Sequence, residues 1–416
     1  MKVYLVGGAV RDQLMGVPSK DHDWVVVGAT LEEMIAKGFR QVGKDFPTLL
    51  HPLTGEEYSL ARRERTGGVA TFSPDVTLQE DLGKRDLTIN AMAMELFDQG
   101  TPLESFKLYD PYFGHDDLLN KMLRMVSAES FIEDPIRVLR VARFAARYPD
   151  FRIDSNTMLA MTLQVQHGRL DNLVPERVWK ELSRGLMEKQ PSRMLQVLRQ
   201  CGALRVILPE VDALYGVPQP AQWHPEIDTG IHIEQVLDYA ASQQFELPVR
   251  LACLLHDLGK AMTPPEEWPA HHGHEALGVG TVSVVCNRLR VPDALARVAI
   301  TTSREHGIIH GIMSAKTTTV VKLLRRCDAF RNPDRFQYVL QAAMCDARGR
   351  HSETLSYRNT EYPQAMRLSS ALWAARQVKG NEIGAQFKDR PQEIAVHLHA
   401  ARARAIKVFE RQQLGK

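Results

Sequence analysis

Two aspartates near the amino end are spaced to bind one metal ion. Asp21 and Asp23 flank His22 and directly precede the apolar, β-branched run 24–27. Because alternate side chains of a strand share one face, both carboxylates can reach the same cation while His22 points away. Hard oxygen ligands suit Mg²⁺, and two such ions can clamp the attacking and leaving oxygens of a phosphoryl displacement. A lone Asp-x-Asp is more often an Asx turn, so the pair needs supporting features.

A diglycine and an arginine upstream supply that support. Gly7 and Gly8 follow an expected short strand at 3–6, and Arg11 lies one turn into an expected helix at 10–15. Glycine lets backbone amides approach a triphosphate with no Cβ in the way, and arginine binds phosphate oxygens. Glycines, arginine and paired aspartates in this order favour nucleotide chemistry over a simple turn.

Length and composition describe an ordinary globular chain. The 416 residues include 52 Lys and Arg against 50 Asp and Glu, a net charge of +2, with 44% hydrophobic and 25% charged residues. This balance excludes a highly charged nucleic-acid coat, an acidic tail protein and a disordered chain. Any nucleic-acid contact must therefore come from local clusters of charge.

Cysteine usage and hydropathy indicate a cytoplasmic protein. The five cysteines are odd in number, scattered, and never form Cys-x-x-Cys, which predicts reduced core thiols rather than a disulfide scaffold. No run approaches the roughly 18 apolar residues that a membrane helix needs. The first apolar run ends too soon, at the diglycine, for a signal peptide.

Periodicity divides the chain into an α/β part and a helical part. Apolar β-branched runs predict strands at 3–6, 24–27 and 57–61, and a stretch rich in Gly, Pro and Ser predicts a mobile loop at 66–75. The connector 216–230, rich in Pro and Trp, is expected to separate domains. The expected domains are a head (1–115), a helical neck and body (116–225), a histidine-bearing helical module (228–330) and a helical tail (331–416), the last with no assigned chemistry.

Four segments in order resemble one family. Residues 6–28, VGGAVRDQLMG…KDHDWVVVG, resemble the signature of the class II tRNA nucleotidyltransferase/poly(A) polymerase family, within the polymerase-β-like nucleotidyltransferases. GKRDLTINA at 83–91, EDPIRVLR at 133–140 and PERVWKEL at 175–182 resemble three further motifs of that family. One departure is Lys84, where the family often has arginine.

The resemblance implies an α+β architecture and a specific activity. The fold would be a polymerase-β-like nucleotidyltransferase head followed by an all-α neck and body and a helical HD domain. The activity would be addition and repair of the 3′-terminal CCA of tRNA without a nucleic-acid template, from CTP and ATP, with release of pyrophosphate. Asp21 and Asp23 would hold Mg²⁺, with Glu57 as the best match for a third carboxylate and Glu56 as its rival. The nucleotide contacts it implies are Gly8, Arg11, Arg85, Arg137 and Arg140.

Asp134 and Arg137 offer a physical basis for selecting C and A. Both bases carry an amino donor beside a ring nitrogen acceptor, so a carboxylate can accept and a guanidinium can donate. Uracil and guanine present a carbonyl there, which Asp134 would repel. The i, i+3 spacing predicts that both side chains share one helix face. An isolated Asp-x-x-Arg is otherwise an ordinary surface ion pair.

A second constellation lies in the helical module. His256 and Asp257 follow an apolar helix, His232 begins another, and Asp346 comes much later. The order H…HD…D resembles the HD phosphohydrolase superfamily, whose ligands converge on one divalent metal. Imidazole and carboxylate ligands suit Ni²⁺, Mn²⁺ or Co²⁺. The implied activity is that of a metal-dependent phosphatase and 2′,3′-cyclic phosphodiesterase. Secondary candidates, otherwise interpreted as solvated polar residues, are His271, His272, His274, His306 and His310.

Arginines are the candidate tRNA contacts. At about 100° per residue, four arginines of one helix fall within a single arc opposite an apolar stripe. The four are Arg137, Arg140, Arg143 and Arg147. Three further candidates lie later in the chain, at Arg169, Arg177 and Arg184. A solvated helix face is an equal alternative for each of them. A monomer is expected, with a homo-oligomer as the alternative.

Two other functions remain open at this point. A poly(A) polymerase shares the head motifs, although the HD module and the lack of a strongly basic tail argue against it. A non-polymerising RNA-binding protein with a decayed head and an active HD module is the second, and the intact Asp21 and Asp23 argue against that. The switch from C to A addition is assigned to the loop at 66–75.

Overall fold

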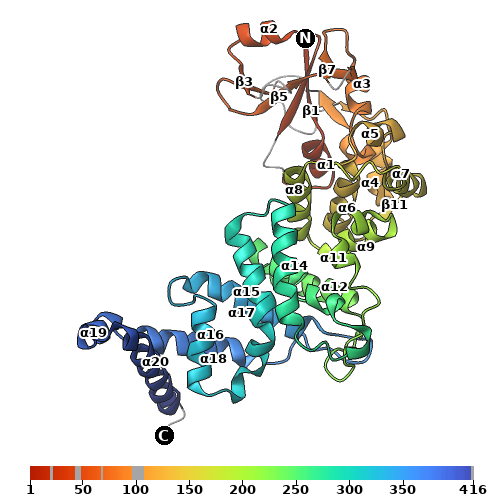
Figure 1. Ribbon diagram of the computed structural model, residues 1–416. Helices are drawn as coiled ribbons and strands as arrows, with labels where there is room; N and C mark the ends of the chain where they lie inside the picture. The colour runs from red at the N-terminus through yellow and green to blue at the C-terminus, as the bar shows by residue number, and fades with distance from the viewer. Residues whose placement is uncertain (19–21, 43–47, 67–68, 96–106, 414–416) are drawn as a thin grey trace. The chain divides into compact units, whose positions relative to one another are not determined.

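The computed structural model describes residues 1–18, 22–42, 48–66, 69–95 and 107–413 (Figure 1). The chain forms two compact units, one of Met1–Leu173 with Gln200–Ala203 and one of Val174–Arg199 with Leu204–Lys416. Within the described residues, no helix has both the length and the apolar character that crossing a bilayer requires. The five cysteines are buried free thiols, as their spacing predicted.

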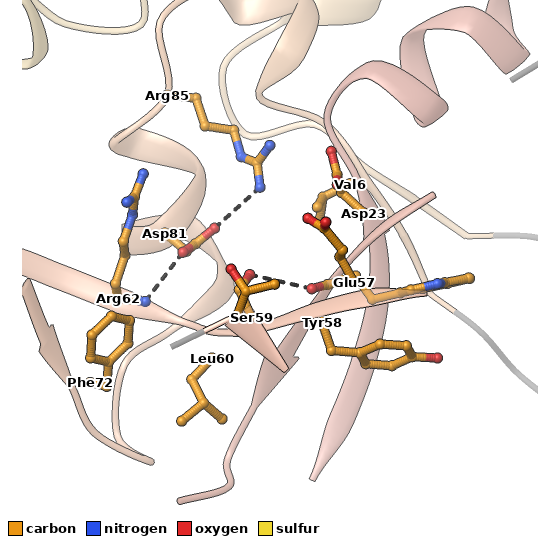
Figure 2. A pocket seen from close by; sticks show the side chains of 12 residues that line it. Val6, Asp23, Glu57, Tyr58, Ser59, Leu60, Arg62, Phe72, Asp81 and Arg85 are labelled. Atoms are coloured by element: carbon orange, nitrogen blue, oxygen red, sulfur yellow. Dashed lines mark hydrogen bonds and ion pairs between the residues drawn. The ribbon is translucent and has the colours of Figure 1, made fainter. Parts of the chain in front are cut away.

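The first unit is built on a seven-stranded sheet with the order β3-β4-β5-β2-β1-β8-β9. Only β2 and β5 run parallel, and every other neighbouring pair is antiparallel. The strands are β1 (Lys2–Val6), β2 (Asp23–Val27), β3 (Arg40–Val42), β4 (Thr48–Leu50), β5 (Glu57–Leu60), β8 (Ala93–Glu95) and β9 (Leu108–Tyr109). The register pairs Asp23 of β2 with Glu57 of β5 (Figure 2).

Helices and short strands complete this unit. They are α1 (Gly8–Leu14), α2 (Leu31–Ala36), α3 (Leu78–Gly83), η1 (Thr88–Asn90), α4 (Gly114–Leu119), α5 (Ala128–Glu133), α6 (Arg137–Arg147), α7 (Ser155–Gln166), β10 (Met122–Leu123) and β11 (Arg152–Ile153). Capping boxes start both α2 and α3, in which Thr30 and Thr77 accept from the third helical N–H.

The prediction of a loop at 66–75 is wrong for Thr66 and for Val69–Phe72, which lie in strands. β6 (Arg62–Thr66) and β7 (Val69–Phe72) pair as an antiparallel hairpin, while residues 67–68 lie outside the described residues. The run Val69–Phe72 holds β-branched and aromatic residues, which favour a strand.

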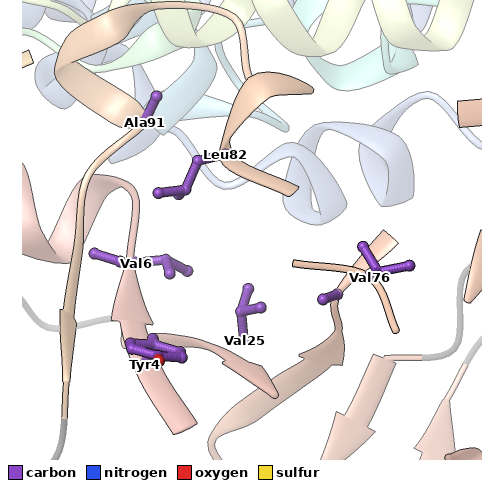
Figure 3. Packing of buried hydrophobic residues seen from close by; sticks show 8 residues of the cluster. Tyr4, Val6, Val25, Val76, Leu82 and Ala91 are labelled. Atoms are coloured by element: carbon purple, nitrogen blue, oxygen red, sulfur yellow. The ribbon is translucent and has the colours of Figure 1, made fainter. Parts of the chain in front are cut away.

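Two-residue alternation gives the sheet two buried faces. Tyr4, Val6 and Val25 pack with Leu82 of α3 on one face (Figure 3). The intervening residues, such as Leu5 and Val26, face the opposite side, toward α1 and α2. Asp23 and Glu57 therefore share the α3 face with Val25, at the point where the apolar packing gives way to solvent.

In its described residues the second unit is built of helices joined by turns and irregular segments. Its elements are α8 (Pro175–Leu186), α9 (Pro191–Gln200), α10 (Ala203–Ile207), α11 (Pro209–Asp212), α12 (Thr229–Ser242), α13 (Leu247–Leu255), η3 (Leu258–Met262), η4 (Pro265–Glu267), α14 (His274–Arg288), α15 (Asp293–His310), η5 (Gly311–Ser314), α16 (Thr317–Arg326), α17 (Pro333–Gly349), α18 (Pro363–Arg376), α19 (Gly380–Gln386) and α20 (Pro391–Gln413). α9 and α10 each contribute their residues nearest 200–203 to the first unit. Helices α12, α13, α15 and α17 pack on one another and bring the histidines together.

Candidate active sites

The first candidate site is a pocket at the amino-terminal ends of β2 and β5, where Asp23 and Glu57 lie. Asp23, Glu57 and Ser59 line it from the sheet, and Asp81 and Arg85 line it from α3 and the segment that follows α3 (Figure 2). Asp23 and Glu57 are exposed register partners on parallel strands, so their carboxylates project from the same face. Two carboxylates opposite an arginine form an arrangement suited to a metal-bound phosphate.

The geometry separates Glu57 from its rival. Glu56 points away from the pocket, where it bonds His22 Nδ1 at 3.0 Å and accepts from Thr54 Oγ1 at 3.1 Å. One residue along a strand reverses the face, which is why only one of two adjacent glutamates can join Asp23. Asp21, the other predicted magnesium ligand, lies outside the described residues.

The diglycine turn brings an arginine to this pocket. Gly7 has a φ of 70°, and a Cβ there would lie 2.6 Å from Nη1 of Arg85. Glycine is therefore required both by the left-handed backbone and by the guanidinium resting on the turn. Asp81 Oδ2 lies 3.6 Å from Nη2 of Arg85 and orients it. Gly8 begins α1, where a Cβ would lie 3.4 Å from Arg11.

Arg11 is buried, and its bonds are internal to the head. Its guanidinium donates to Asn90 and to Asp12 and lies over the rings of Phe144 and Tyr148. Only 3% of the residue is exposed. In this structure Arg11 fixes α1 against η1 and α6, so its sequence-based role as a phosphate ligand requires it to exchange partners.

Asp86 joins the GKRDLTINA segment to α6. It accepts from Arg140 Nε at 2.8 Å, from Asn90 at 3.0 Å and from the backbone N–H of Leu87 at 2.8 Å. Burial alone would raise the pKa of Asp86, but Arg140 and these donors outweigh it and hold the pKa well below its usual range. Arg140 keeps a third of its side chain exposed and can still reach a ligand.

Asp134 and Arg137 do not share a helix face, so that prediction is wrong. α6 begins at Arg137, whereas Asp134 caps the end of α5 with φ −141° and ψ 90°. The cause is Pro135, whose ring excludes the helical region for the residue before it. Arg137 is buried and donates to the backbone carbonyls of Lys84 and Arg85. Burial lowers the pKa of Arg137.

The arginine arc on α6 is not a free basic face. Arg137 and Arg143 are less than a tenth exposed, and Arg147 pairs with Asp12 at 3.2 Å. The solvated-face interpretation therefore fails for these two buried arginines, and a phosphate contact at either would require it to exchange partners, as at Arg11. Arg169, Arg177 and Arg184 are exposed.

The second candidate site collects the predicted histidine and aspartate ligands. Nε2 of His232 lies 3.2 Å from Asp346 Oδ1 and 3.8 Å from Asp257 Oδ2. Nε2 of His256 lies 3.1 Å from Asp257 Oδ2 and 3.9 Å from Asp346 Oδ2. The four side chains come from α12, α17 and the α13–η3 junction, and all are at most 3% exposed.

Ring orientation at this site matches metal ligation. His232 Nδ1 faces Glu226 Oε1 at 2.8 Å, and His256 Nδ1 faces the carbonyl oxygen of Cys253 at 2.9 Å. A carbonyl oxygen can only accept, so His256 Nδ1 carries the proton and the His256 Nε2 lone pair is directed at the carboxylates. Both ring nitrogens of His232 are buried without a hydrogen-bond partner among the described residues. His256 Nε2 and Asp257 Oδ1 are buried without a hydrogen-bond partner, which is expected of atoms that ligate a cation. The residues fit a divalent metal.

The charges at this site agree with that assignment. Burial would raise the pKa of Asp257 and of Asp346, but basic neighbours lower both well below the usual range. The strongest such neighbours are His256 and Lys260 for Asp257, and Arg350 and His310 for Asp346. Both carboxyl groups are therefore ionised and able to act as ligands.

The secondary histidines divide into three kinds. His272 is exposed, as the solvated interpretation predicted, whereas His271 is buried and bonds Thr263 and the carbonyl oxygen of Pro218. His310 bonds Asp346 Oδ2 at 2.6 Å and Tyr362 at 3.0 Å. His274 and His306 each place Nε2 at 3.5 Å from Asp257 Oδ1, so the solvated interpretation is wrong for both.

Sequence reasoning missed several supporting residues. Glu226 and Gln219 come from the stretch interpreted as a connector, yet they contact His232 and Lys260 respectively. Lys260 Nζ lies 2.7 Å from Asp257 Oδ2, and Arg350 Nη2 lies 2.8 Å from Asp346 Oδ1. The i, i+3 and i, i+4 spacings of Lys260 and Arg350 from their carboxylates were available signals.

Three family models match successive parts of the chain. Residues 3–124 match the poly A polymerase head domain, residues 150–215 match a probable RNA and SrmB-binding site of polymerase A, and residues 229–332 match the HD domain. The sheet with the first pocket lies in the first match. His232, His256 and Asp257 lie in the third, and Asp346 lies beyond its end.

Full-length relatives decide the family. A multifunctional CCA protein of Paraburkholderia phymatum is 52% identical over 412 residues, covering 98% of this chain and 97% of its own length. The chain belongs to the multifunctional CCA protein family. A member from Herminiimonas arsenicoxydans is 50% identical over 416 residues, covering 98% of this chain and 97% of its own. These matches confirm the predicted nucleotidyltransferase head followed by a helical body and an HD domain.

Solved structures share the fold of this family member. A CCA-adding enzyme in complex with ATP superposes with a TM-score of 0.64 at 21% identity, covering 97% of this chain and 86% of that one. The Thermotoga maritima CCA-adding enzyme complexed with tRNA gives a TM-score of 0.55 at 22% identity, covering 91% and 78%. At these identities the likeness concerns the fold.

Proposed function

We propose that this nucleotidyltransferase adds the 3′-terminal CCA to tRNA without a nucleic-acid template, from CTP and ATP, and releases pyrophosphate. The observation that carries the proposal is the pairing of Asp23 with Glu57 in a pocket shared with Arg85. Relatives that share 50–52% sequence identity over nearly the whole chain carry the name multifunctional CCA protein. Solved neighbours of the same fold are complexes with ATP, CTP and tRNA.

In the head, Asp23 and Glu57, with Asp21, would hold Mg²⁺. When bound, the metal would neutralise charge on the α-phosphate and the leaving pyrophosphate. Arg85 would bind the triphosphate from across the pocket, and Gly7 leaves room for it on the turn. The tRNA 3′-hydroxyl would attack the α-phosphorus, so this chain's main contribution is positioning and charge neutralisation.

Asp134 and Arg137 would select the base from neighbouring segments rather than from one helix face. Asp134 stands at the end of α5 and can accept from the exocyclic amino group of C or A. Arg137 is already held by the carbonyls of Lys84 and Arg85, which fixes its remaining N–H donors in place. Gly8, Arg11 and Arg140 complete the proposed nucleotide contacts.

In the HD domain, His232, His256, Asp257 and Asp346 would hold a divalent transition metal such as Ni²⁺. When bound, the metal would activate water and bind a phosphate oxygen. We assign to this site a phosphatase and 2′,3′-cyclic phosphodiesterase activity toward tRNA ends. Glu226 would hold the His232 ring, and Lys260 and Arg350 would offset the charge of the two aspartates.

The exposed Arg169, Arg177 and Arg184 are the proposed tRNA phosphate contacts. The head at 1–115, the neck and body at 116–225, the HD domain at 228–330 and the tail at 331–416 remain our proposed division of the chain. Cytoplasmic location and a monomeric state remain predictions from the sequence.

The test uses tRNA lacking its CCA end, incubated with CTP, ATP and Mg²⁺. Addition that stops after C, C and A supports the proposal. A long adenylate tail would instead identify a poly(A) polymerase, and no incorporation would favour a non-polymerising RNA-binding protein. A Glu57→Gln variant serves as the negative control, with Glu56→Gln as the matched neighbour.

A further inference from the structure

Two hydroxyl side chains lie beside the carboxylate pair on the floor of the first pocket. Ser59 is two residues beyond Glu57 on β5, so both side chains project from one face of the sheet, about 6.6 Å apart along the strand. Figure 2 shows Ser59 beside Glu57. Thr48 of β4 is the register partner of Ser59 and shares that face. Both residues are half-buried and line the pocket, which therefore continues past the carboxylates onto β5 and β4.

The order of the strands places the two reactants on opposite sides of the carboxylates. Gly7 directly follows β1 and lies against Arg85, so the proposed triphosphate contacts flank the pair on the β1 side. β5 and β4 lie on the other side of β2. An in-line displacement requires the attacking and leaving oxygens to face each other across the phosphorus. Because pyrophosphate would leave toward Arg85, the attacking 3′-hydroxyl would come from the side of Ser59 and Thr48.

The hydroxyl of Ser59 faces the pocket as an acceptor. It donates its proton to the carbonyl oxygen of Trp24 at 3.3 Å. A hydroxyl has one proton and two lone pairs, so the Ser59 oxygen can still accept hydrogen bonds but has no proton left to donate. A ligand group that bonds Ser59 must therefore be a donor. The 2′-hydroxyl of a ribose lies next to the 3′-hydroxyl, can donate, and is absent from DNA.

We propose that Ser59 reads the 2′-hydroxyl of the nucleotide being extended, so that the pocket floor on β5 and β4 is a subsite for the terminal ribose of RNA. The inference rests on the proposed nucleotide addition in the head. The 2′-hydroxyl donates to Ser59 Oγ while the neighbouring 3′-hydroxyl lies against Asp23 and Glu57, and Thr48 borders the sugar. An acceptor that ends in 2′-deoxyribose loses this hydrogen bond and with it part of its orientation.

Two competing explanations give Ser59 a different role. In the first, Ser59 only ties β5 to β2 through the carbonyl of Trp24. Ser59→Ala would then slow addition to every acceptor alike. In the second, Ser59 contacts the ribose of the incoming nucleotide. Discrimination would then lie between ATP and 2′-deoxy-ATP rather than between two kinds of acceptor end.

The test uses the full chain and two tRNAs that lack only the final A. One ends in cytidine and the other in 2′-deoxycytidine. Initial rates with ATP and Mg²⁺ give kcat/KM for each acceptor. We expect the parent to prefer the ribose end by about 10-fold, the effect of one hydrogen bond. Ser59→Ala should make the two acceptors nearly equal, through a loss on the ribose end alone, and should leave the preference for ATP over 2′-deoxy-ATP unchanged.

Ser283→Ala is the matched control. Ser283 is also half-buried and donates its proton to a carbonyl oxygen, that of Val279 at 2.9 Å. It lies in α14 of the second unit, outside the pocket. The Ser283→Ala protein should therefore keep the preference of the parent for the ribose end. Circular dichroism checks that both variants are folded.

The outcomes distinguish this inference from the proposed function. A parent that adds A equally well to both acceptors overturns the ribose subsite and leaves CCA addition intact. An unchanged ribose preference in folded Ser59→Ala also overturns the inference, as do equal losses on both acceptors. A changed preference for ATP over 2′-deoxy-ATP would place Ser59 at the incoming nucleotide and contradict the assignment. A parent that extends neither acceptor overturns the proposed function and this inference with it.

Discussion

Asp23 and Glu57 lie directly opposite each other as the first residues of neighbouring parallel strands. Their separation in sequence is long, but their separation in the sheet is one strand spacing, about 4.8 Å. A parallel pair aligns like faces, so both carboxylates project toward α3 and Arg85. This relationship turns two unremarkable acidic residues into a candidate metal clamp.

The first prediction concerns these carboxylates. Glu57→Gln should lower kcat for CCA addition by about 100-fold or more, because a neutral amide cannot offset the charge of a metal ion. Glu56→Gln should stay within a few-fold of the parent, since Glu56 bonds His22 and Thr54 away from the pocket. Single-turnover assays with CTP measure both variants. Equal losses in the two would remove Glu57 from the site.

Asp86 carries the second prediction, which concerns stability and pH. The pKa of Asp86 in the folded head is far below its unfolded value of about 3.9. The causes are Arg140, Asn90 and the backbone N–H of Leu87. The contribution of ionised Asp86 to the free energy of unfolding is therefore complete above the unfolded pKa, and it declines as the pH falls toward the folded pKa. Asp86→Asn should destabilise the head by about 3 kcal/mol at pH 7 and by less at pH 3.

Hydrogen exchange over residues 82–95 measures that effect, with parent and variant compared at the same pH. Asp75→Asn is the control, because the pKa of Asp75 is also lowered, yet its side chain is 64% exposed and pairs with Arg63 at the surface. A loss of protection in Asp86→Asn that is as large at pH 3 as at pH 7 would show that the charge of Asp86 is not the cause.

Local sequence patterns predicted much of the head. Where the structure differs from those predictions, the physical cause can be identified. The β1 and β2 runs and the diglycine turn are local signals, so the sequence alone predicted them. The hairpin of β6 and β7 was interpreted as a loop because the Gly, Pro and Ser content of 66–75 was given more weight than the β-branched and aromatic residues of Val69–Phe72. Asp134 was placed on a helix despite Pro135, whose steric effect outweighs i, i+3 spacing.

The HD site shows a different limit. His232, His256, Asp257 and Asp346 were recognisable by type and order, but nothing local distinguishes His274 from the exposed His272 two residues earlier. Their roles differ because α14 begins at His274 and packs on η3 and α15. That packing is a long-range property of the fold. Burial of Arg11 by Asn90, Phe144 and Tyr148 is likewise invisible in the sequence.

A third prediction separates the two active sites. His256→Ala should lower hydrolysis of a tRNA 2′,3′-cyclic phosphate to a phosphomonoester by about 100-fold or more, because the proposed HD-site metal loses a ligand. CCA addition should remain at the parent level, since His256 belongs to the second compact unit and the nucleotide pocket to the first. His272→Ala is the matched control. Loss of both activities in folded His256→Ala would refute separate sites.

Base selection gives a fourth prediction. Asp134→Asn replaces an obligate acceptor with an amide that can also donate, so uracil is no longer repelled. The ratio of kcat/KM for UTP to that for CTP should rise about 10-fold or more. Glu133→Gln is the control, because that neighbouring carboxylate pairs with Lys84 at 2.9 Å. An unchanged ratio in Asp134→Asn would place base reading elsewhere in the head.

The last prediction tests the packing that forms the HD site. A Cβ on Gly259 would lie 1.9 Å from the carbonyl oxygen of His274, so Gly259→Ala must displace the start of α14. We expect destabilisation of about 1–3 kcal/mol, as for other overpacked interiors, and faster hydrogen exchange in α14. Gly280 lies within α14, and a Cβ there would have no atom within 4 Å. Gly280→Ala should therefore raise the free energy of unfolding by about 1 kcal/mol. Calorimetry measures both variants, and a Gly259→Ala protein that melts like the parent would contradict the close approach of η3 and α14 on which the histidine geometry depends.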